Sequence, residues 1–321
     1  MMNFHSLKLS RQLRGMVLLL SVCWMATPLL AQHAHLYAGV ATQGPGVPLW
    51  FQNGNVWDTN SYGGYAQAPA CIYFESNLPS IYPGLHQTAT TFSALPATVF
   101  KGGPSPFAAG LGTYVELRFV SLQGPAGGSL LIWNEVNDPA HPSVMFSLPV
   151  GTTNGTNRFN LSEGDPSDPS ADPYGHIHGR RLTLNKPGLY TVGLQLVDTS
   201  HNGAGGGGPV QSPSPVSYFY LQAGLHLSNF SRSNNVVVAR FGLPGFTNYV
   251  FEASPVLPAT NWQTVATVTG TSHSELRWVR DTNAAPFRYY RLRRGTSPAA
   301  APAGGTESRK SQQLQQPEDL Q

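Results

Sequence analysis

Two closely spaced histidine pairs are the residues of this chain with the clearest chemistry. His176 and His178 are separated by one isoleucine, and His33 and His35 are separated by one alanine. On an extended strand, residues at i and i+2 point to the same face, so the two imidazoles of a pair can bind one cation. Neutral imidazole binds zinc, copper and nickel well. The pattern therefore predicts a transition-metal site, with zinc as the expected ion.

Further ligands would have to come from elsewhere in the fold. His86 is the best candidate, and His141, in a proline-flanked loop, is a weaker one. Four imidazoles complete the tetrahedral shell of zinc and three leave one open position, so about one zinc ion per chain is expected. The alternative is that these histidines lie at the edge of the core and are hydrogen-bonded to the backbone. The predicted ligands are His33, His35, His86, His176 and His178.

The direction of the His-Ile-His pair depends on the strand that carries it. If the strand 176–184 runs unbroken, both histidines share a face with Leu182 and Leu184 and point into the interior of a sandwich. A β-bulge at Gly179 would break that inference. Buried imidazoles need hydrogen-bond acceptors or a cation, which favours a metal at this position.

Four carboxylates lie in the loop 163–172, just before the His-Ile-His pair. Oxygen ligands at such close spacing could bind calcium, although the prolines between them break the EF-hand pattern. The other interpretation is a solvated loop whose last carboxylate orients one of the two histidines by a hydrogen bond. The four carboxylates are Glu163, Asp165, Asp168 and Asp172.

Residues 1–31 have the pattern of a secretory signal peptide. Lys8, Arg11 and Arg14 form a basic region, and an apolar run over 16–30 follows and ends before an alanine. The run is short and contains a proline, which favours cleavage over a membrane anchor. The mature chain is therefore expected to be extracytoplasmic (periplasmic, secreted or at the cell surface), with no membrane span.

Composition agrees with an exported protein. Removing the three basic residues of the signal peptide brings the formal charge from +3 to zero, which disfavours binding to nucleic acid. Only Cys71 remains, so no intramolecular disulfide can form. Charged residues make up 11% of the chain, while glycine and proline are frequent, which is typical of exported all-β proteins.

Short alternating apolar runs predict an all-β fold with no amphipathic helix. We expect a histidine-containing β-sandwich over 32–223, a smaller β-sandwich over 224–294 and a disordered tail over 295–321. The glycine-rich segment 202–215 is interpreted as a loop within the first domain, because the strand after it can join the same sheet. The predicted strands are 115–119, 129–133, 144–148, 176–184, 190–196, 217–222, 236–240, 249–253, 262–268, 275–279 and 287–292.

Two parts of the chain resemble known families. The first is Gly-His-Ile-His at 175–178, Leu-Thr-Leu at 182–184 and Pro-Gly-Leu-Tyr at 187–190, which resembles the actinobacterial surface-anchored repeat. The resemblance implies an extracytoplasmic β-domain of the choice-of-anchor type, associated with zinc or manganese import. The chain lacks a visible sorting signal or anchor helix, which leaves surface anchoring open.

The second resemblance covers the C-terminal strands. Tyr-Val-Phe-Glu-Ala-Ser at 249–254, Thr-Asn-Trp-Gln-Thr-Val at 260–265 and Phe-Arg-Tyr-Tyr-Arg-Leu at 287–292 resemble the small fibronectin-like modules of exported proteins from the Verrucomicrobia. An accessory or spacer role is what this resemblance implies.

The expected function is metal capture, buffering or delivery to an importer, such as a metal ABC importer, or to another cell-surface component. No catalytic constellation is visible: the chain has no Gly-x-Ser-x-Gly motif and no identified pair of catalytic carboxylates. The rival hypothesis is a structural or carbohydrate-binding surface protein without a metal role. Its aromatic binding face would consist of Trp50, Trp57, Tyr62 and Tyr65.

Overall fold

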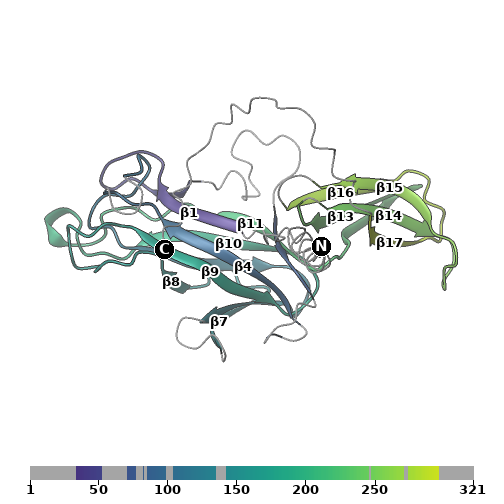
Figure 1. Ribbon diagram of the computed structural model, residues 1–321, viewed down its shortest axis with the longest axis horizontal. Helices are drawn as coiled ribbons and strands as arrows, with labels where there is room; N and C mark the ends of the chain where they lie inside the picture. The colour runs from purple at the N-terminus through teal and green to yellow at the C-terminus, as the bar shows by residue number, and fades with distance from the viewer. Residues whose placement is uncertain are drawn as a thin grey trace, which may run out of the picture. The chain divides into compact units, whose positions relative to one another are not determined.

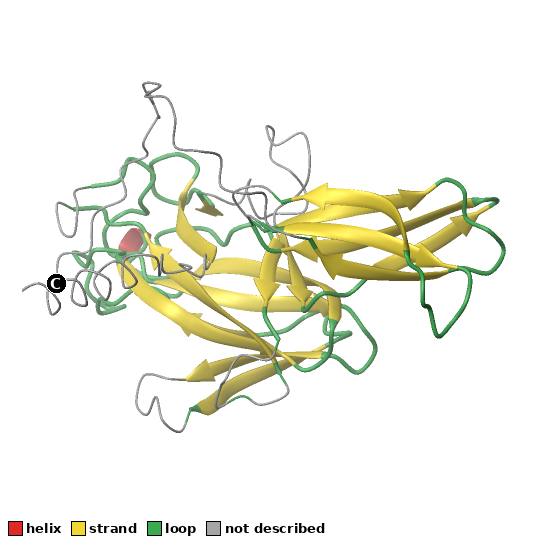
Figure 2. Ribbon diagram, turned by 45° about the vertical axis from the view of Figure 1, so that its right-hand side comes forward, coloured by secondary structure: helices red, strands yellow, loops and turns green. Residues whose placement is uncertain are grey.

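The computed structural model describes residues 34–52, 71–76, 82, 85–98, 104–134, 142–245, 247–270 and 274–295. Within these ranges strands are almost the only regular secondary structure, and turns and loops connect them (Figure 1). One short 3₁₀ turn, η1 at Ala204–Gly206, is the only helical element in this part of the chain (Figure 2). The predicted all-β class is confirmed. The predicted signal peptide and C-terminal tail lie outside the described residues, and no helix among those described is long and apolar enough to cross a membrane.

The strands follow the chain in short segments separated by turns. They are β1 Ala34–Val40, β2 Leu49–Phe51, β3 Cys71–Phe74, β4 His86–Ala94, β5 Val115–Gln123, β6 Ser129–Asn134, β7 Ser143–Pro149, β8 Asn157–Asn160, β9 Gly175–Leu184, β10 Gly188–Asp198, β11 Ser217–Ala223, β12 Ser228–Ser233, β13 Val236–Leu243, β14 Asn248–Ser254, β15 Gln263–Thr269, β16 Glu275–Asp281 and β17 Tyr289–Arg294. Each strand predicted from the sequence overlaps one of these.

The first eleven strands form a sandwich of two sheets. One has the order β2-β1-β4-β9-β6-β7 and the other the order β3-β11-β10-β5-β8. Alternate residues of both sheets meet in one apolar core, which contains Leu36, Phe92, Phe119, Leu182 and Phe219. Each such buried side chain stabilises the fold by about 1.5–3 kcal/mol relative to its exposed state.

The segment 202–215 lies within this sandwich. Strand β11, which follows it, pairs antiparallel with β10 from Gly188 opposite Ala223 to Leu194 opposite Ser217. The segment is held by the buried carboxylate of Asp198, which accepts hydrogen bonds from the backbone N–H groups of Tyr114, Ser200 and Gln211 at 3.0, 2.9 and 2.9 Å. It is therefore a loop between two neighbouring strands of one sheet.

A β-bulge interrupts the pairing of β9 with β4. Thr90 lies opposite Arg180, but Phe92 lies opposite Ile177, so two residues of β9 face the single residue Thr91. Gly179, one of the two, has a φ of 63° and donates its N–H to Thr91 Oγ1 at 3.2 Å. The extra residue reverses the alternation of the strand from this point.

The last six strands form a second, smaller sandwich. Its sheets have the orders β12-β13-β16 and β15-β14-β17, and they enclose a separate core that includes Phe241, Tyr249, Phe251 and Val279. The Phe251 and Tyr290 rings stack with their centroids 5.2 Å apart. This architecture is a β-sandwich, while its likeness to fibronectin-type modules remains a prediction.

Backbone and side-chain hydrogen bonds join the two sandwiches within one compact unit. Gln222 on β11 is fully buried, and its Oε1 accepts the N–H of Gly242 on β13 at 2.9 Å. Its Nε2 donates to the carbonyl of Gly224 at 2.9 Å. The Cys71 N–H donates to the carbonyl of Ser274 at 3.0 Å, and burial raises the pKa of the Cys71 thiol. Cys71 is a free cysteine in this buried junction.

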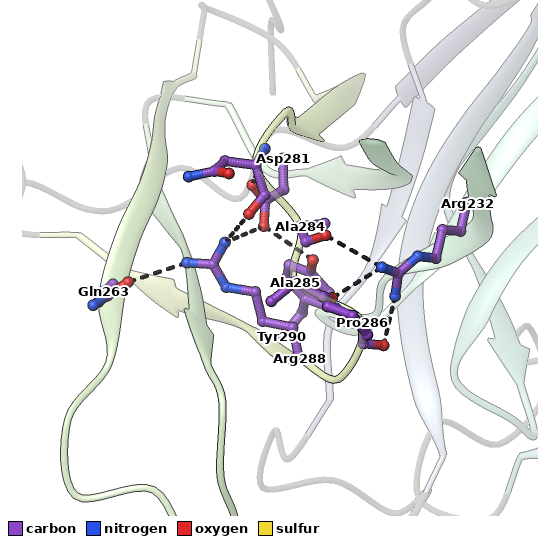
Figure 3. Close-up of polar contacts among 9 residues, drawn as sticks. Arg232, Gln263, Asp281, Ala284, Ala285, Pro286, Arg288 and Tyr290 are labelled. Carbon is purple, nitrogen blue, oxygen red and sulfur yellow. Dashed lines mark hydrogen bonds and ion pairs between the residues drawn. The ribbon is translucent and has the colours of Figure 1, made fainter. Parts of the chain in front are cut away.

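A buried carboxylate organises one end of the smaller sandwich (Figure 3). Asp281 Oδ2 accepts from Arg288 Nη1 at 2.8 Å and from the Tyr290 hydroxyl at 3.0 Å. Burial, together with the hydrogen bond to Asp281, raises the pKa of Tyr290 to about 12. Arg232 on β12 donates to the carbonyls of residues 284–286 from the other side. These contacts fix the loop that connects β16 to β17.

A second buried carboxylate, Glu252 on β14, lies between two arginines of β17. Its oxygens are 2.7 Å from Arg291 Nε and 3.1 Å from Arg293 Nη2. Burial alone would raise the pKa of Glu252, but the hydrogen bonds and positive charges of the two arginines outweigh it and hold the pKa below its ordinary value. The ionised carboxylate therefore ties two strands of one sheet together.

Replacing Gly179 by alanine is expected to lower the free energy of unfolding by about 1 kcal/mol, because an L-residue is strained at a φ of 63°. No atom lies within 4 Å of the position that the new Cβ would take, so the backbone conformation alone sets the cost. Gly207 is the matched control, since it is equally open but has an extended φ of −131°. Urea unfolding of both variants measures the difference, and equal losses would contradict the interpretation.

Glu252→Gln is expected to destabilise the protein at neutral pH and to flatten the acid limb of its stability curve. The folded pKa of Glu252 lies below the ordinary value of 4.5, so its contribution is complete above about pH 4.5 and is lost as the pH falls through the lower folded pKa. Thermal unfolding of wild type and variant between pH 3 and pH 7 measures this, and parallel curves across that range would refute it.

Candidate functional site

The structure brings His176 and His178 together, as the sequence predicts, but on the opposite face. Both side chains are exposed on the outer face of the six-stranded sheet, and their ring centroids are 5.8 Å apart. The inference that they point into the sandwich required an unbroken strand, and the bulge at Gly179 breaks it. Ile177 packs against the core, and beyond Gly179 the core-facing positions shift to Arg180 and Leu182.

The ring of His176 has a fixed hydrogen-bond partner. Ser93 lies opposite His176 on β4, and its Oγ is 2.7 Å from His176 Nδ1. When Nδ1 carries the proton and donates to this hydroxyl, Nε2 keeps its lone pair, which is the form of histidine that binds a metal ion. The backbone N–H of His176 also donates to Glu163 Oε1 at 3.0 Å. One carboxylate of the acidic loop therefore lies beside the histidine pair.

His35 occupies the same outer face, two strands away. It is half-buried on β1 in register with Thr91 of β4, and Thr91 in turn faces the bulge that contains His178. The backbones of β1 and β9 are therefore about 10 Å apart across Thr91. The ring centroid of His35 is 6.1 Å from that of Tyr37, whose pKa is raised by burial. His33 and His141 lie outside the described residues.

His86 lies in a different part of the sheet. It lies at the start of β4, where it pairs with Leu184 of β9. This position is seven residues before Ser93, or about 23 Å along the strand. Its Nδ1 is buried and has no hydrogen-bond partner among the described residues. Burial, and then the charge of the nearby His226, lower the pKa of His86. The structure does not bring His86 to the other predicted ligands.

The aspartates of the acidic loop make hydrogen bonds close to themselves in the chain. Asp165 Oδ1 accepts from the N–H and hydroxyl of Ser167 at 2.9 and 2.7 Å, and Asp168 Oδ1 makes the same two bonds to Ser170 at 2.8 and 2.7 Å. These bonds hold the pKa values of both aspartates below the ordinary value. One oxygen of Asp165 and one of Asp168 is thus already used by the loop itself.

Asp172 is held by four hydrogen bonds from the backbone and from a threonine side chain. Its two oxygens accept hydrogen bonds from the N–H groups of Ala97, Thr98 and Tyr174 and from the Thr98 hydroxyl, at 2.6 to 3.0 Å. Burial would raise the pKa of Asp172, but these four hydrogen bonds outweigh it and lower the pKa. Asp172 therefore connects the loop to the segment after β4.

The histidine pair is the largest ligand set that the described part of the chain offers. Within these residues no three side chains of histidine, cysteine, aspartate or glutamate lie close enough to hold a metal ion together. Two imidazoles leave at least two positions of a tetrahedral zinc ion for water or for ligands from another molecule. An ion bound by this pair alone would therefore lie at the surface with positions open to exchange.

The sequence analysis named one of the two features that shape the site, a bulge at Gly179, and did not find the other. The glycine within the predicted strand, Gly179, is the only signal of the bulge, because a glycine inside a strand pattern often marks one. Nothing in the sequence identifies Ser93 as the partner of His176. Of the aromatic residues in the rival hypothesis, Trp50 is half-buried on β2 and the other three lie outside the described residues.

Comparison with known proteins adds no further evidence about the site. No protein-family model, no curated protein and no solved structure matches this chain. The resemblances to the surface-anchored repeat and to fibronectin-like modules remain predictions, and the functional argument depends on the geometry of the residues themselves.

Proposed function

We propose that this chain is an exported protein that binds a transition-metal ion, most favourably zinc, through His176 and His178. The observation that carries the proposal is the pair of exposed imidazoles, with ring centroids 5.8 Å apart on one strand. Imidazole nitrogen suits zinc, copper and nickel, whereas calcium and magnesium prefer oxygen ligands. The hydrogen bond between His176 Nδ1 and Ser93 Oγ supports the proposal, because it orients one of the two rings.

Exposure of the pair favours capture, buffering or delivery over a structural role. Structural zinc sites are closed, with four protein ligands, and they contribute to folding. An ion held by two imidazoles at the surface keeps open positions that water or a partner's ligands can fill. Such an ion can be passed to an importer or to another cell-surface component, which is the partner class we propose.

His35 is the nearest further imidazole among the described residues. It lies on the same outer face, separated from the pair by Thr91. We propose that His176 and His178 bind the ion directly and that His35 contributes less. His86 has no part in this site, because its register position places it far along β4.

His176→Ala and His178→Ala are each expected to weaken zinc binding by about tenfold or more, because either change removes one of two direct ligands. Titration of the purified protein with zinc by calorimetry measures the affinity and a stoichiometry of about one ion per chain. His201→Ala is the control, since His201 is an exposed histidine in the loop after β10. Absence of binding in wild type, or an equal loss in the control, would refute the proposal.

Ser93→Ala is expected to weaken zinc binding by about tenfold while leaving the stoichiometry unchanged, because loss of an orienting hydrogen bond to a ligand histidine costs about 10- to 100-fold in affinity. His35→Ala should have a smaller effect than His178→Ala. The same calorimetric titration measures both. A loss in His35→Ala as large as in His178→Ala would mean that the ion lies between the two strands.

A further inference from the structure

An exposed row of aromatic side chains with an intervening arginine runs across strands β11, β13 and β16. Trp278 on β16 is 57% exposed, and Tyr218 on β11 is 36% exposed. Tyr220, two residues after Tyr218 on β11, and Arg240 on β13 are half-buried. Large aromatic side chains that remain exposed together on one face are common in binding surfaces. We name this row, Tyr218, Tyr220, Arg240 and Trp278, the aromatic row.

Arg240 holds the row in a fixed arrangement. Its guanidinium carbon is 4.6 Å from the Trp278 ring centroid and 4.9 Å from that of Tyr220, so the arginine lies against both rings. Its Nη2 also donates to the Tyr220 hydroxyl at 3.3 Å. In the sheet, Arg240 and Trp278 are direct cross-strand partners. The rings are thus positioned before any ligand binds, which lowers the entropic cost of binding.

The ring of Tyr218 packs on a glycine of the neighbouring strand. Tyr218 lies over Gly193 of β10, its cross-strand partner, and a Cβ at Gly193 would lie 3.3 Å from Tyr218 Cε1. Because Gly193 has no side chain, the ring of Tyr218 can lie directly on the backbone of β10, which fixes its position. Tyr218 and Tyr220 are at i and i+2, so their rings follow each other on the same face.

The charge around the row is positive. Among the described residues of β12, β13 and β16, the face that carries Trp278 also carries Arg240 and Arg280. The two carboxylates of β16 are buried, and each is paired with another arginine: Glu275 with Arg277 and Asp281 with Arg288. The row therefore presents aromatic rings and cations with no carboxylate of its own.

We propose that the aromatic row binds an acidic polysaccharide, a glycan chain with uronate carboxylates. The apolar C–H faces of sugar rings can pack on the rings of Tyr218, Tyr220 and Trp278, and uronate carboxylates complement the charge of Arg240 and Arg280. Two arginines are too few for the phosphate contacts that sustain nucleic-acid binding, so a glycan is favoured. The proposal is independent of the metal site.

Affinity electrophoresis of the full chain in gels that contain polygalacturonate tests the proposal. Wild type should be retarded, and Trp278→Ala should weaken binding by about tenfold, because exposed tryptophans are frequent centres of binding energy. Arg280→Gln should weaken binding to polygalacturonate but not to its neutral methyl ester. Phe287→Ala, which removes an aromatic side chain that is 83% exposed outside the row, is the control.

Thermal unfolding establishes that each variant is folded, and Trp278→Phe, which keeps a ring, should retain part of the affinity. No retardation of wild type would overturn the proposal, as would equal binding by Trp278→Ala or an equal loss in Phe287→Ala. Tighter binding of an oligothymidylate through the same residues would also overturn it, because the row would then be a surface for single-stranded nucleic acid.

Discussion

The bulge in β9 is the constraint on which the candidate metal site depends. The side-chain period of a strand is two, so a single extra residue sends every following side chain to the other face. Here the extra residue lies at Gly179, between the histidines and the leucines of the same strand. It lets Ile177, Leu182 and Leu184 all pack in the core while the two imidazoles face outward. An unbroken strand would have buried the imidazoles.

Local patterns were predictable, and non-local pairings were not. Within β5 and β10, residues 115–119 and 190–196 alternate between apolar residues and polar residues or glycine, so the sequence identifies these strands. Strand β4 reads His-Gln-Thr-Ala-Thr-Thr-Phe-Ser-Ala, and it is a strand because it lies between β1 and β9, with Thr90 and Thr91 fully buried. The His-Ile-His pair was likewise predictable from spacing alone. The position of His86 depends on the register between β4 and β9, which no local pattern encodes.

The sparse carboxylates of this chain act mainly as anchors for backbone and arginine groups. Asp198 and Asp172 each accept several backbone N–H bonds from segments distant in sequence, while Asp281 and Glu252 pair with arginines within the smaller sandwich. A carboxylate that is already satisfied in this way is a poor calcium ligand, because binding the ion would break its existing hydrogen bonds. This is a physical reason to place the proposed metal site on imidazoles.

A two-imidazole surface site also constrains how zinc could be selected. In the Irving–Williams order, nitrogen ligands bind Cu²⁺ more tightly than Zn²⁺, and a pair of exposed rings imposes little coordination geometry of its own. Selectivity for zinc must then come from metal availability in the compartment or from ligands supplied by a partner. A site that needs its partner to complete the shell binds loosely by itself and transfers readily. Within the proposed function, the exposure of His176 and His178 therefore favours delivery over storage.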